Sequence, residues 1–271
     1  MNKIFFSDLD GTLLTTDKKI SPKTREALDR WLSDGNLLAI SSGRPLPSVK
    51  EVMINNGLIG KNIFGIAFNG GQIYDTVTDK IILEKTIPLD EVKTIGMLAR
   101  ENGIYCHTYD DTHILSPRKG KETDFYTVTI HLPINVLPDF PEGVTKRPPK
   151  FLCIDPDLEH DLDGFADLIM SKLPDITCVK SNRYLLEVFP SSSGKGAAVK
   201  DFCALTGTDI NDSYAAGDEQ NDLSMIEAAG HGIAMINGNP MLKERADIIT
   251  PFDNDHDGLA GILVDIIEHK L

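Results

Sequence analysis

The chain has 271 residues, 41% of them hydrophobic and 25% charged, which is typical of a globular protein with one large or two medium domains. Its formal net charge of −14 excludes the basic surface of a nucleic-acid-binding protein and the polybasic patch of a peripheral membrane protein. Such an acidic chain repels anions at long range, so any anion site must be built locally.

The four cysteines, at positions 106, 153, 178 and 203, form no CxxC pair and sit among apolar neighbours. This pattern indicates buried thiols and does not support a metal finger or a redox motif. No apolar run reaches the length of a membrane span, and the N-terminal one is too short for a signal peptide. We expect a cytoplasmic protein with no membrane or nucleic-acid partner, either a monomer or a small homo-oligomer.

The N-terminal third alternates between strand and helix patterns. An apolar strand at 3–9 is followed by a helix that Ser21 can cap, that Pro22 suits in its first turn, and that Gly35 can end. Strands at 37–42 and 62–71 flank a helix at 49–56. This alternation predicts a parallel sheet with helical crossovers.

The middle of the chain has a different pattern. It predicts a hairpin at 72–85, a helix at 89–101, an irregular stretch at 133–149, and then a mixed unit of strands, hairpins and one helix. The strand–helix alternation returns at Gly194. We therefore expect an α/β core made of residues 1–83 and 188–271, interrupted by an inserted α+β domain at 84–187.

Polar residues gather where the core strands end. Ligands of open parallel sheets bind beyond the carboxyl ends of the strands, so these residues are expected to meet at one rim. They are Asp8, Asp10, Ser42, Gly43, Asn69, Asp218, Asn221 and Asp222, together with Lys195 at the start of a helix.

Several carboxylates in one place need a cation, and oxygen ligands beside a phosphate favour Mg²⁺. Asp8 could then stay ionised and act as a nucleophile, while Asp10 exchanges a proton with the leaving group. Ser42 and the amide of Gly43 could bind phosphate oxygens, and Lys195 could neutralise their charge.

Four segments in order, DLDGTL at 8–13, ISSGR at 40–44, SGKGAAV at 193–199 and GDEQND at 217–222, resemble the motifs of the haloacid dehalogenase superfamily. The large insertion between the second and third motifs resembles the Cof-like branch, which carries a type C2 cap. The resemblance implies a Rossmann-like parallel-sheet core with an inserted α+β cap domain.

The resemblance also implies roles for single residues. Asp8 would form an aspartyl-phosphate that water hydrolyses, and Asp10 would act as general acid and then base, with its backbone carbonyl on Mg²⁺. Asp218 would be a second carboxylate ligand, and Asp222 would bind the metal directly or through water. The phosphate would be held by Ser42, Gly43, Lys195 and Asn221. Asn69 could contact substrate or simply form the turn before its glycines.

These roles predict a Mg²⁺-dependent phosphatase acting on small phosphorylated metabolites, with sugar phosphates favoured by analogy alone. Two alternatives stay open: a sugar phosphomutase, and a non-catalytic sensor of phosphometabolites. The motifs do not separate phosphatase from phosphomutase, whereas the intact acidic residues argue against the sensor.

The segment DNDHDG at 253–258 matches the first half of a calcium-binding loop. Val264 stands where such a loop needs its bidentate acid, so we interpret the segment as a helix-capping turn.

Overall fold

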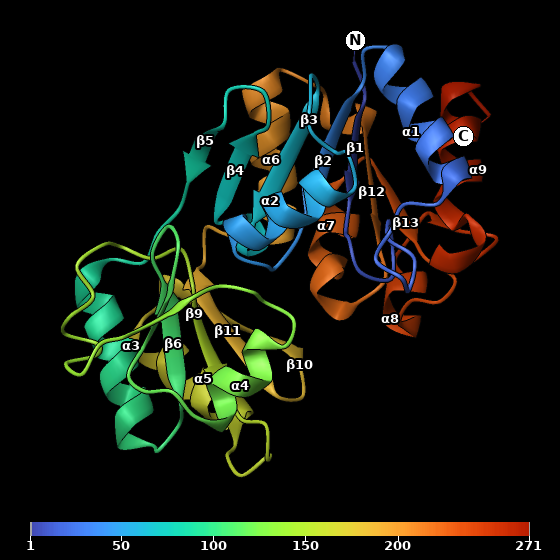
Figure 1. Ribbon diagram of the computed structural model, residues 1–271. Helices are drawn as coiled ribbons and strands as arrows, with labels where there is room; N and C mark the ends of the chain where they lie inside the picture. The colour runs from blue at the N-terminus through green and yellow to red at the C-terminus, as the bar shows by residue number, and fades with distance from the viewer. Residues whose placement is uncertain (1, 271) are drawn as a thin grey trace. The chain divides into compact units, whose positions relative to one another are not determined.

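The computed structural model describes residues 2–270, which form two compact units, each with its own sheet (Figure 1). The first unit contains residues 2–43, 49–82 and 194–270, and the second contains residues 44–48 and 83–193. The predicted fold class, an α/β parallel-sheet core with an inserted α+β domain, is confirmed. The second unit extends to Ser193, past the expected position 187, because strand β11 (Leu185–Pro190) pairs along its whole length with β10 (Ile176–Asn182).

The first unit is built on an eight-stranded sheet in the order β14-β13-β12-β1-β2-β3-β4-β5. The six strands from β14 to β3 pair in parallel, and β4 runs antiparallel to β3. The strands are β1 Ile4–Ser7, β2 Leu37–Ser41, β3 Ile63–Ala67, β4 Gln72–Asp75, β5 Lys80–Glu84, β12 Ser213–Gly217, β13 His231–Ala234 and β14 Ile248–Ile249.

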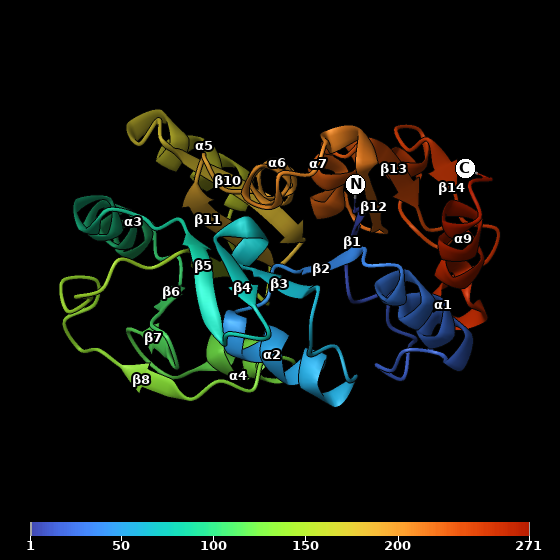
Figure 2. The same cartoon turned by 90° about the horizontal axis from the view of Figure 1, so that it is seen from above.

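Helices cover both faces of this sheet because successive residues of β1 point to opposite sides. Phe5 meets Trp31 of α1 (Pro22–Ser33) edge to face, and Phe6 meets Phe202 of α6 (Lys195–Thr206), both with ring centroids 5.9 Å apart. Figure 2 shows α6 and α7 on the opposite side of the sheet from α1 and α9. The other helices of this sheet are α2 Leu46–Asn55, α7 Leu223–Ala228, α8 Pro240–Lys243 and α9 Gly258–Ile267.

The second unit has a six-stranded sheet in the order β10-β11-β9-β6-β7-β8. Its apolar core joins alternate strand residues such as Phe151 and Val188 to Ile95 of α3 and Ile169 of α5. The remaining elements are α3 Leu89–Glu101, β6 Cys106–Tyr109, β7 Ile114–Ser116, α4 Lys121–Thr127, β8 Ile134–Val136, β9 Phe151–Ile154 and α5 Leu162–Lys172.

The helix α3 lies at the predicted positions, but two short elements were not predicted. The stretch expected to be irregular contains β8, which pairs in parallel with β7, and α4 precedes it. Both are too short to show a periodic pattern. Among the described residues, no helix combines the length and apolarity needed to cross a bilayer.

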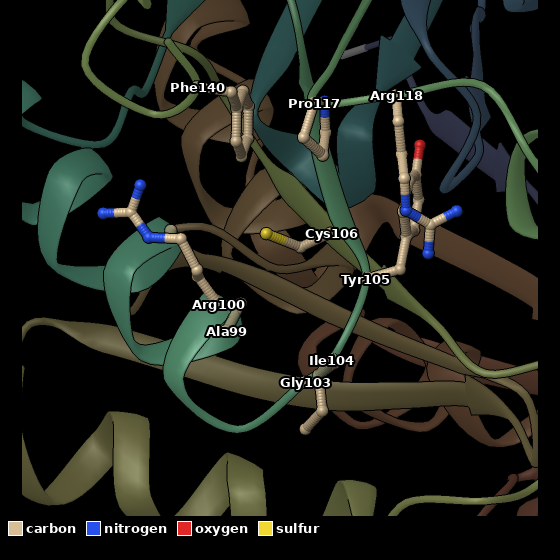
Figure 3. A pocket seen from close by; sticks show the side chains of 10 residues that line it. Ala99, Arg100, Gly103, Ile104, Tyr105, Cys106, Pro117, Arg118 and Phe140 are labelled. Atoms are coloured by element: carbon tan, nitrogen blue, oxygen red, sulfur yellow. The ribbon is translucent and has the colours of Figure 1, made fainter. Parts of the chain in front are cut away.

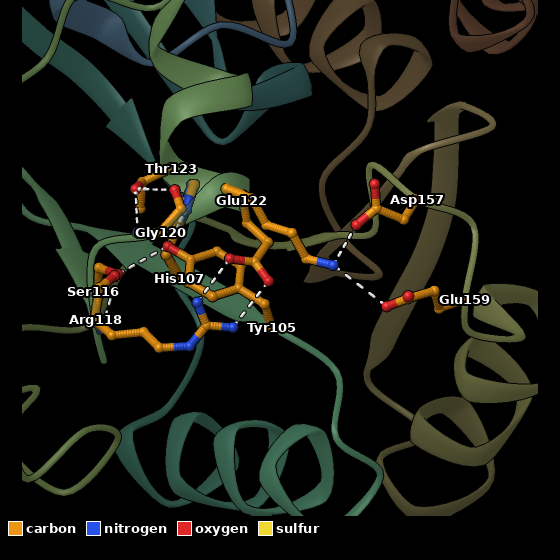
Figure 4. Close-up of polar contacts among 10 residues, drawn as sticks. Tyr105, His107, Ser116, Arg118, Gly120, Glu122, Thr123, Asp157 and Glu159 are labelled. Atoms are coloured by element: carbon orange, nitrogen blue, oxygen red, sulfur yellow. Dashed lines mark hydrogen bonds and ion pairs between the residues drawn. The ribbon is translucent and has the colours of Figure 1, made fainter.

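Four buried polar rings form a chain in the second unit, and Figure 4 labels two of them, Tyr105 and His107. One ring nitrogen of His107, Nδ1, lies 3.3 Å from the Tyr105 hydroxyl, and Nε2 lies 3.0 Å from the Tyr109 hydroxyl. Tyr109 in turn donates to the Tyr126 hydroxyl at 2.8 Å. Burial, reinforced by the nearby positive charge of Lys150, lowers the pKa of His107 to about 3.

This buried histidine predicts a loss of stability in acid. Between its folded pKa of about 3 and its ordinary value of 6.5, the unfolded chain binds a proton that folded His107 does not. The contribution of this group should therefore lower the free energy of unfolding by about 2 kcal/mol on acidification to pH 5. Urea unfolding of His107→Gln should show a shallower decline than the unsubstituted protein below pH 6.5, with parallel curves at pH 7–8. Equal slopes below pH 6.5 would contradict the buried neutral histidine.

Candidate active site

The parallel register of β1 and β12 brings two aspartates to one rim of the first-unit sheet. Ser7 pairs with Ala216, and the backbone N–H of Asp8 continues the ladder by donating to the Ala216 carbonyl at 3.0 Å. Asp8 and Asp218 each follow the last residue of their strand. Residues more than 200 positions apart thus end side by side.

Lys195, the first residue of α6, lies between two carboxylates. Its ammonium is 2.6 Å from Oδ1 of Asp8 and 2.5 Å from Oδ1 of Asp222, and all three residues are buried. A Cβ on Gly196 would collide with the backbone carbonyl of Ser224, so the glycine allows α6 and α7 to pack closely. This packing fixes the distance between Lys195 and the turn that carries Asp222.

Asp222 and Asp218 are held by further hydrogen bonds. Oδ2 of Asp222 accepts from the backbone N–H groups of Asp218 and Glu219, both at 3.1 Å. Oδ1 of Asp218 accepts from the Thr12 hydroxyl at 2.8 Å. The carboxylates are therefore oriented from both strand ends.

The electrostatics of this group favour an additional positive charge. Asp8, Asp218 and Asp222 each offer an oxygen, and these atoms lie within 4.8 Å of one another beside one ammonium group. Burial raises the pKa of Asp8 to about 8 against the attraction of Lys195, and burial raises the pKa of Asp218 to about 6. For Lys195 the two ion pairs outweigh burial and raise the pKa. A cluster of hard oxygen donors short of positive charge fits a divalent cation such as Mg²⁺.

Asp10 lies in a different environment from Asp8. Its side chain is 37% exposed, and its Oδ1 accepts from the Lys18 ammonium at 2.7 Å. Between the two strand ends, Gly11 has φ +81°, and a Cβ there would collide with the Asp218 carboxylate. Asn237 donates to the Gly11 carbonyl at 2.8 Å, which fixes the turn on its other side.

Backbone hydrogen bonds join the loops that carry the predicted phosphate-binding residues. The Ser42 carbonyl accepts from the N–H of Asn69 at 3.1 Å, and the Asn69 carbonyl accepts from the N–H of Gly194 at 2.8 Å. Gly43 follows Ser42 directly, and Asn221 shares the turn Gln220–Asp222 with Asp222. These bonds connect the loop after β2, the turn after β3 and the start of α6.

The sequence did not single out Thr12, Lys18 or Asn237 for this site. Thr12 lies inside the first motif, so the motif could have indicated that it belongs to the site, where it bonds to Asp218. Lys18 and Asn237 had none, because their contacts depend on how two loops fold back to the strand end.

A separate cavity of about 220 Å³ lies within the second unit, at the end of α3 (Figure 3). Its lining includes Tyr105, Cys106 and two arginines that already pair with glutamates: Arg100 with Glu142 and Arg118 with Glu122. None of the predicted site residues lines it.

The chain is similar to known proteins in sequence and in fold. A family profile described as haloacid dehalogenase-like hydrolase matches residues 5–263. A putative phosphatase of Streptococcus pyogenes is 32% identical, with 93% of this chain and 94% of that protein aligned. A Bacillus subtilis protein named 5-amino-6-(5-phospho-D-ribitylamino)uracil phosphatase is also 32% identical, with the same coverage of the two chains.

The fold is similar to that of a haloacid dehalogenase-like hydrolase from Bacteroides thetaiotaomicron. The TM-score is 0.86 at 29% identity, and the alignment covers 98% of this chain and all of that one. The likeness therefore extends over nearly the whole chain.

Replacing Lys195 by Met should destabilise the protein by about 3–5 kcal/mol, because it leaves buried carboxylates without their counter-ion. Adding Asp8→Asn to the Lys195→Met variant should recover part of that loss, because it removes one of the buried carboxylate charges that have lost their counter-ion. Urea unfolding would measure both effects, with Lys200→Met, an exposed position on the same helix, as the control. A loss no larger than that of the control would mean that Lys195 does not compensate these charges.

Proposed function

The chain is a phosphatase of the haloacid dehalogenase-like hydrolase family, and from that premise we propose that Asp8 attacks the phosphorus of small phosphate monoesters. The observation that carries the proposal is the buried group of Asp8, Lys195 and Asp222 at the rim of the parallel sheet. A carboxylate held by a lysine at a strand end is positioned for in-line attack on a group that enters from the rim. The product of that attack is an aspartyl-phosphate.

In the first step, the bond between Asp8 and phosphorus forms while the bond to the leaving alcohol breaks, and Asp10 donates a proton to the departing oxygen. In the second step, Asp10 takes a proton from a water molecule, whose oxygen attacks the phosphorus and releases Asp8 and inorganic phosphate. Two carboxylates from one strand end can thus divide the nucleophilic and proton-transfer roles.

The remaining polar groups would bind the transferred phosphoryl group. We assign this role to the Ser42 hydroxyl, the Gly43 N–H, the Lys195 ammonium and the Asn221 amide, because their loops converge on the strand end. We assign Asn69 to the turn that joins two of these loops. We further propose that Asn69 contacts the substrate. Positioning and charge neutralisation are what phosphoryl transfer mainly requires.

The acidic group fits Mg²⁺, with Asp8 and Asp218 as side-chain ligands, Asp222 binding directly or through water, and the backbone carbonyl of Asp10 as the further predicted donor. When bound, the ion would neutralise charge on the phosphoryl oxygens. The Thr12 hydroxyl orients Asp218 within this group.

Sugar phosphates are the proposed substrates, and the second unit is proposed to act as the cap that selects the leaving group. The named Bacillus subtilis relative acts on a phosphorylated ribityl compound, which carries a polyhydroxyl chain next to the phosphate ester. A panel containing glucose and mannose phosphates, ribityl phosphates and nucleotides would test the class. The expected product is free phosphate without isomerised sugar phosphate, and isomer without free phosphate would refute hydrolysis in favour of mutase activity.

Asp8→Asn should lower kcat by about 10⁴-fold or more, because the amide is a poor nucleophile. Acid-quenched enzyme should carry labelled phosphate that hydroxylamine releases, and the variant should carry none. Asp29→Asn, on the surface of α1, is the matched control and should keep full activity. Hydrolysis that survives in Asp8→Asn would refute this nucleophile.

Chelation with EDTA should abolish hydrolysis, and added Mg²⁺ should restore it.

Thr12→Val should weaken Mg²⁺ binding about tenfold or more, because Asp218 loses the bond that orients it. Calorimetric titration with Mg²⁺ would measure this affinity, with Thr206→Val at the exposed end of α6 as the control. Turnover that persists in EDTA would show that the carboxylates serve another purpose.

A further inference from the structure

The ammonium of Lys18 lies 2.7 Å from Oδ1 of Asp10. Lys18 stands eight residues after Asp10 and has φ +60°, a left-handed conformation that residues other than glycine adopt infrequently. The contact therefore depends on the loop between them folding back in one particular way.

That loop is a tight hairpin, residues 14–19. The N–H of Thr15 donates to the Lys19 carbonyl at 2.9 Å, and the N–H of Lys18 donates to the Thr15 carbonyl at 2.8 Å. The two bonds close the turn and direct Lys18 back to the strand end.

The C-terminal segment that resembles half of a calcium loop binds this hairpin. Asp255 accepts from both the N–H and the hydroxyl of Thr16, each at 2.7 Å, and Asn254 donates to the Leu14 carbonyl at 2.9 Å. Asp253 orders the segment itself by accepting from the N–H groups of Asp255 and His256. Residues about 240 positions away thus hold the hairpin through three hydrogen bonds.

Two further residues, Asn56 and Asp257, hold the exit of the hairpin. Asn56 of the loop after α2 accepts from the N–H of Ile20 at 3.1 Å and donates to the Lys18 carbonyl at 3.3 Å. Asp257 accepts from the hydroxyl of Ser21, the residue that caps α1, and lies 3.2 Å from the Lys23 ammonium. The segment from Leu14 to Lys23 is therefore attached at both ends.

We propose that Lys18 is a positioning residue for the proton-transfer step: it orients the Asp10 carboxylate, and the segment 253–257 fixes the hairpin that carries it. The inference rests on the proposed function, since it assigns a purpose to Lys18 only if Asp10 transfers the proton. Proton transfer uses one carboxyl oxygen at a time, so a bond at Oδ1 is compatible with both roles of Asp10. The segment 253–257 thereby acts through Lys18 and touches no reacting atom.

The expected size of the effect on kcat follows from how exposed the side chains of Lys18 and Asp10 are. The side chains of Lys18 and Asp10 are 60% and 37% exposed, so water weakens their attraction. Losing the contact should reduce the fraction of correctly oriented Asp10 about two- to fivefold, with a matching fall in kcat. Because binding does not use this contact, KM should stay unchanged.

Leaving-group chemistry separates positioning from general damage. A sugar phosphate needs its departing alkoxide protonated, whereas p-nitrophenyl phosphate releases a stable anion that needs little help. Because Asp10 also serves the second step, which both substrates share, the comparison is made on the first step, the rate at which a single turnover releases the alcohol. Lys18→Met should slow that release about two- to fivefold for the best sugar phosphate of the panel and leave the release of p-nitrophenolate nearly unchanged. Lys18→Arg should restore the sugar phosphate rate, and Lys19→Met, at the next hairpin position, should change neither rate.

Asp255→Ala should reproduce the selective loss, and the double variant Lys18→Met/Asp255→Ala should lose no more than Lys18→Met alone, because both act on one contact. An equal loss of the first-step rate on both substrates, or no loss of that rate on the sugar phosphate, would overturn the proposal. Failure of the proposed function itself would look different: Asp8→Asn would then retain hydrolysis of both substrates.

Discussion

The buried contact of Lys195 with Asp8 and Asp222 is the constraint on which the rest of the site depends. An ammonium and two carboxylates are stable away from water only while all of them stay together. The close packing of α6 on α7, permitted at Gly196, and the parallel register of β1 with β12 hold these groups together. The layers of the first unit therefore serve the site as well as the apolar core.

Asp8 and Asp10 are two residues apart, yet their surroundings differ in the way their proposed roles need. Asp8 is 9% exposed and its oxygen is bound by a buried lysine, which limits competition from water for the carboxylate. Asp10 is at the edge of the site, where its side chain is 37% exposed and bonded to an exposed lysine. A group that must exchange a proton with solvent in every turnover benefits from that access.

The sequence predicted those parts of the structure that a local pattern records. Strand ends, the first helix with its Ser21 cap, and Lys195 at the start of α6 each follow from a few neighbouring residues. Strand β8 and helix α4 were not predicted because they have three and seven residues, too few to show a periodic hydrophobic pattern. The order of the eight strands was not predicted, because it depends on contacts between distant segments.

The segment at 253–258 shows how far such patterns reach. Its acids were interpreted as a helix-capping turn, and Asp253 does cap the short turn that precedes α9. The same turn also presents Asp255 to Thr16, a contact that joins the two ends of the chain and that no spacing of residues encodes. A motif of alternating acids thus has a local use that sequence can predict and a distant use that only the fold determines. Because the hairpin bound by Asp255 follows directly after the first motif, the distant use bears on the orientation of Asp10 rather than on stability alone.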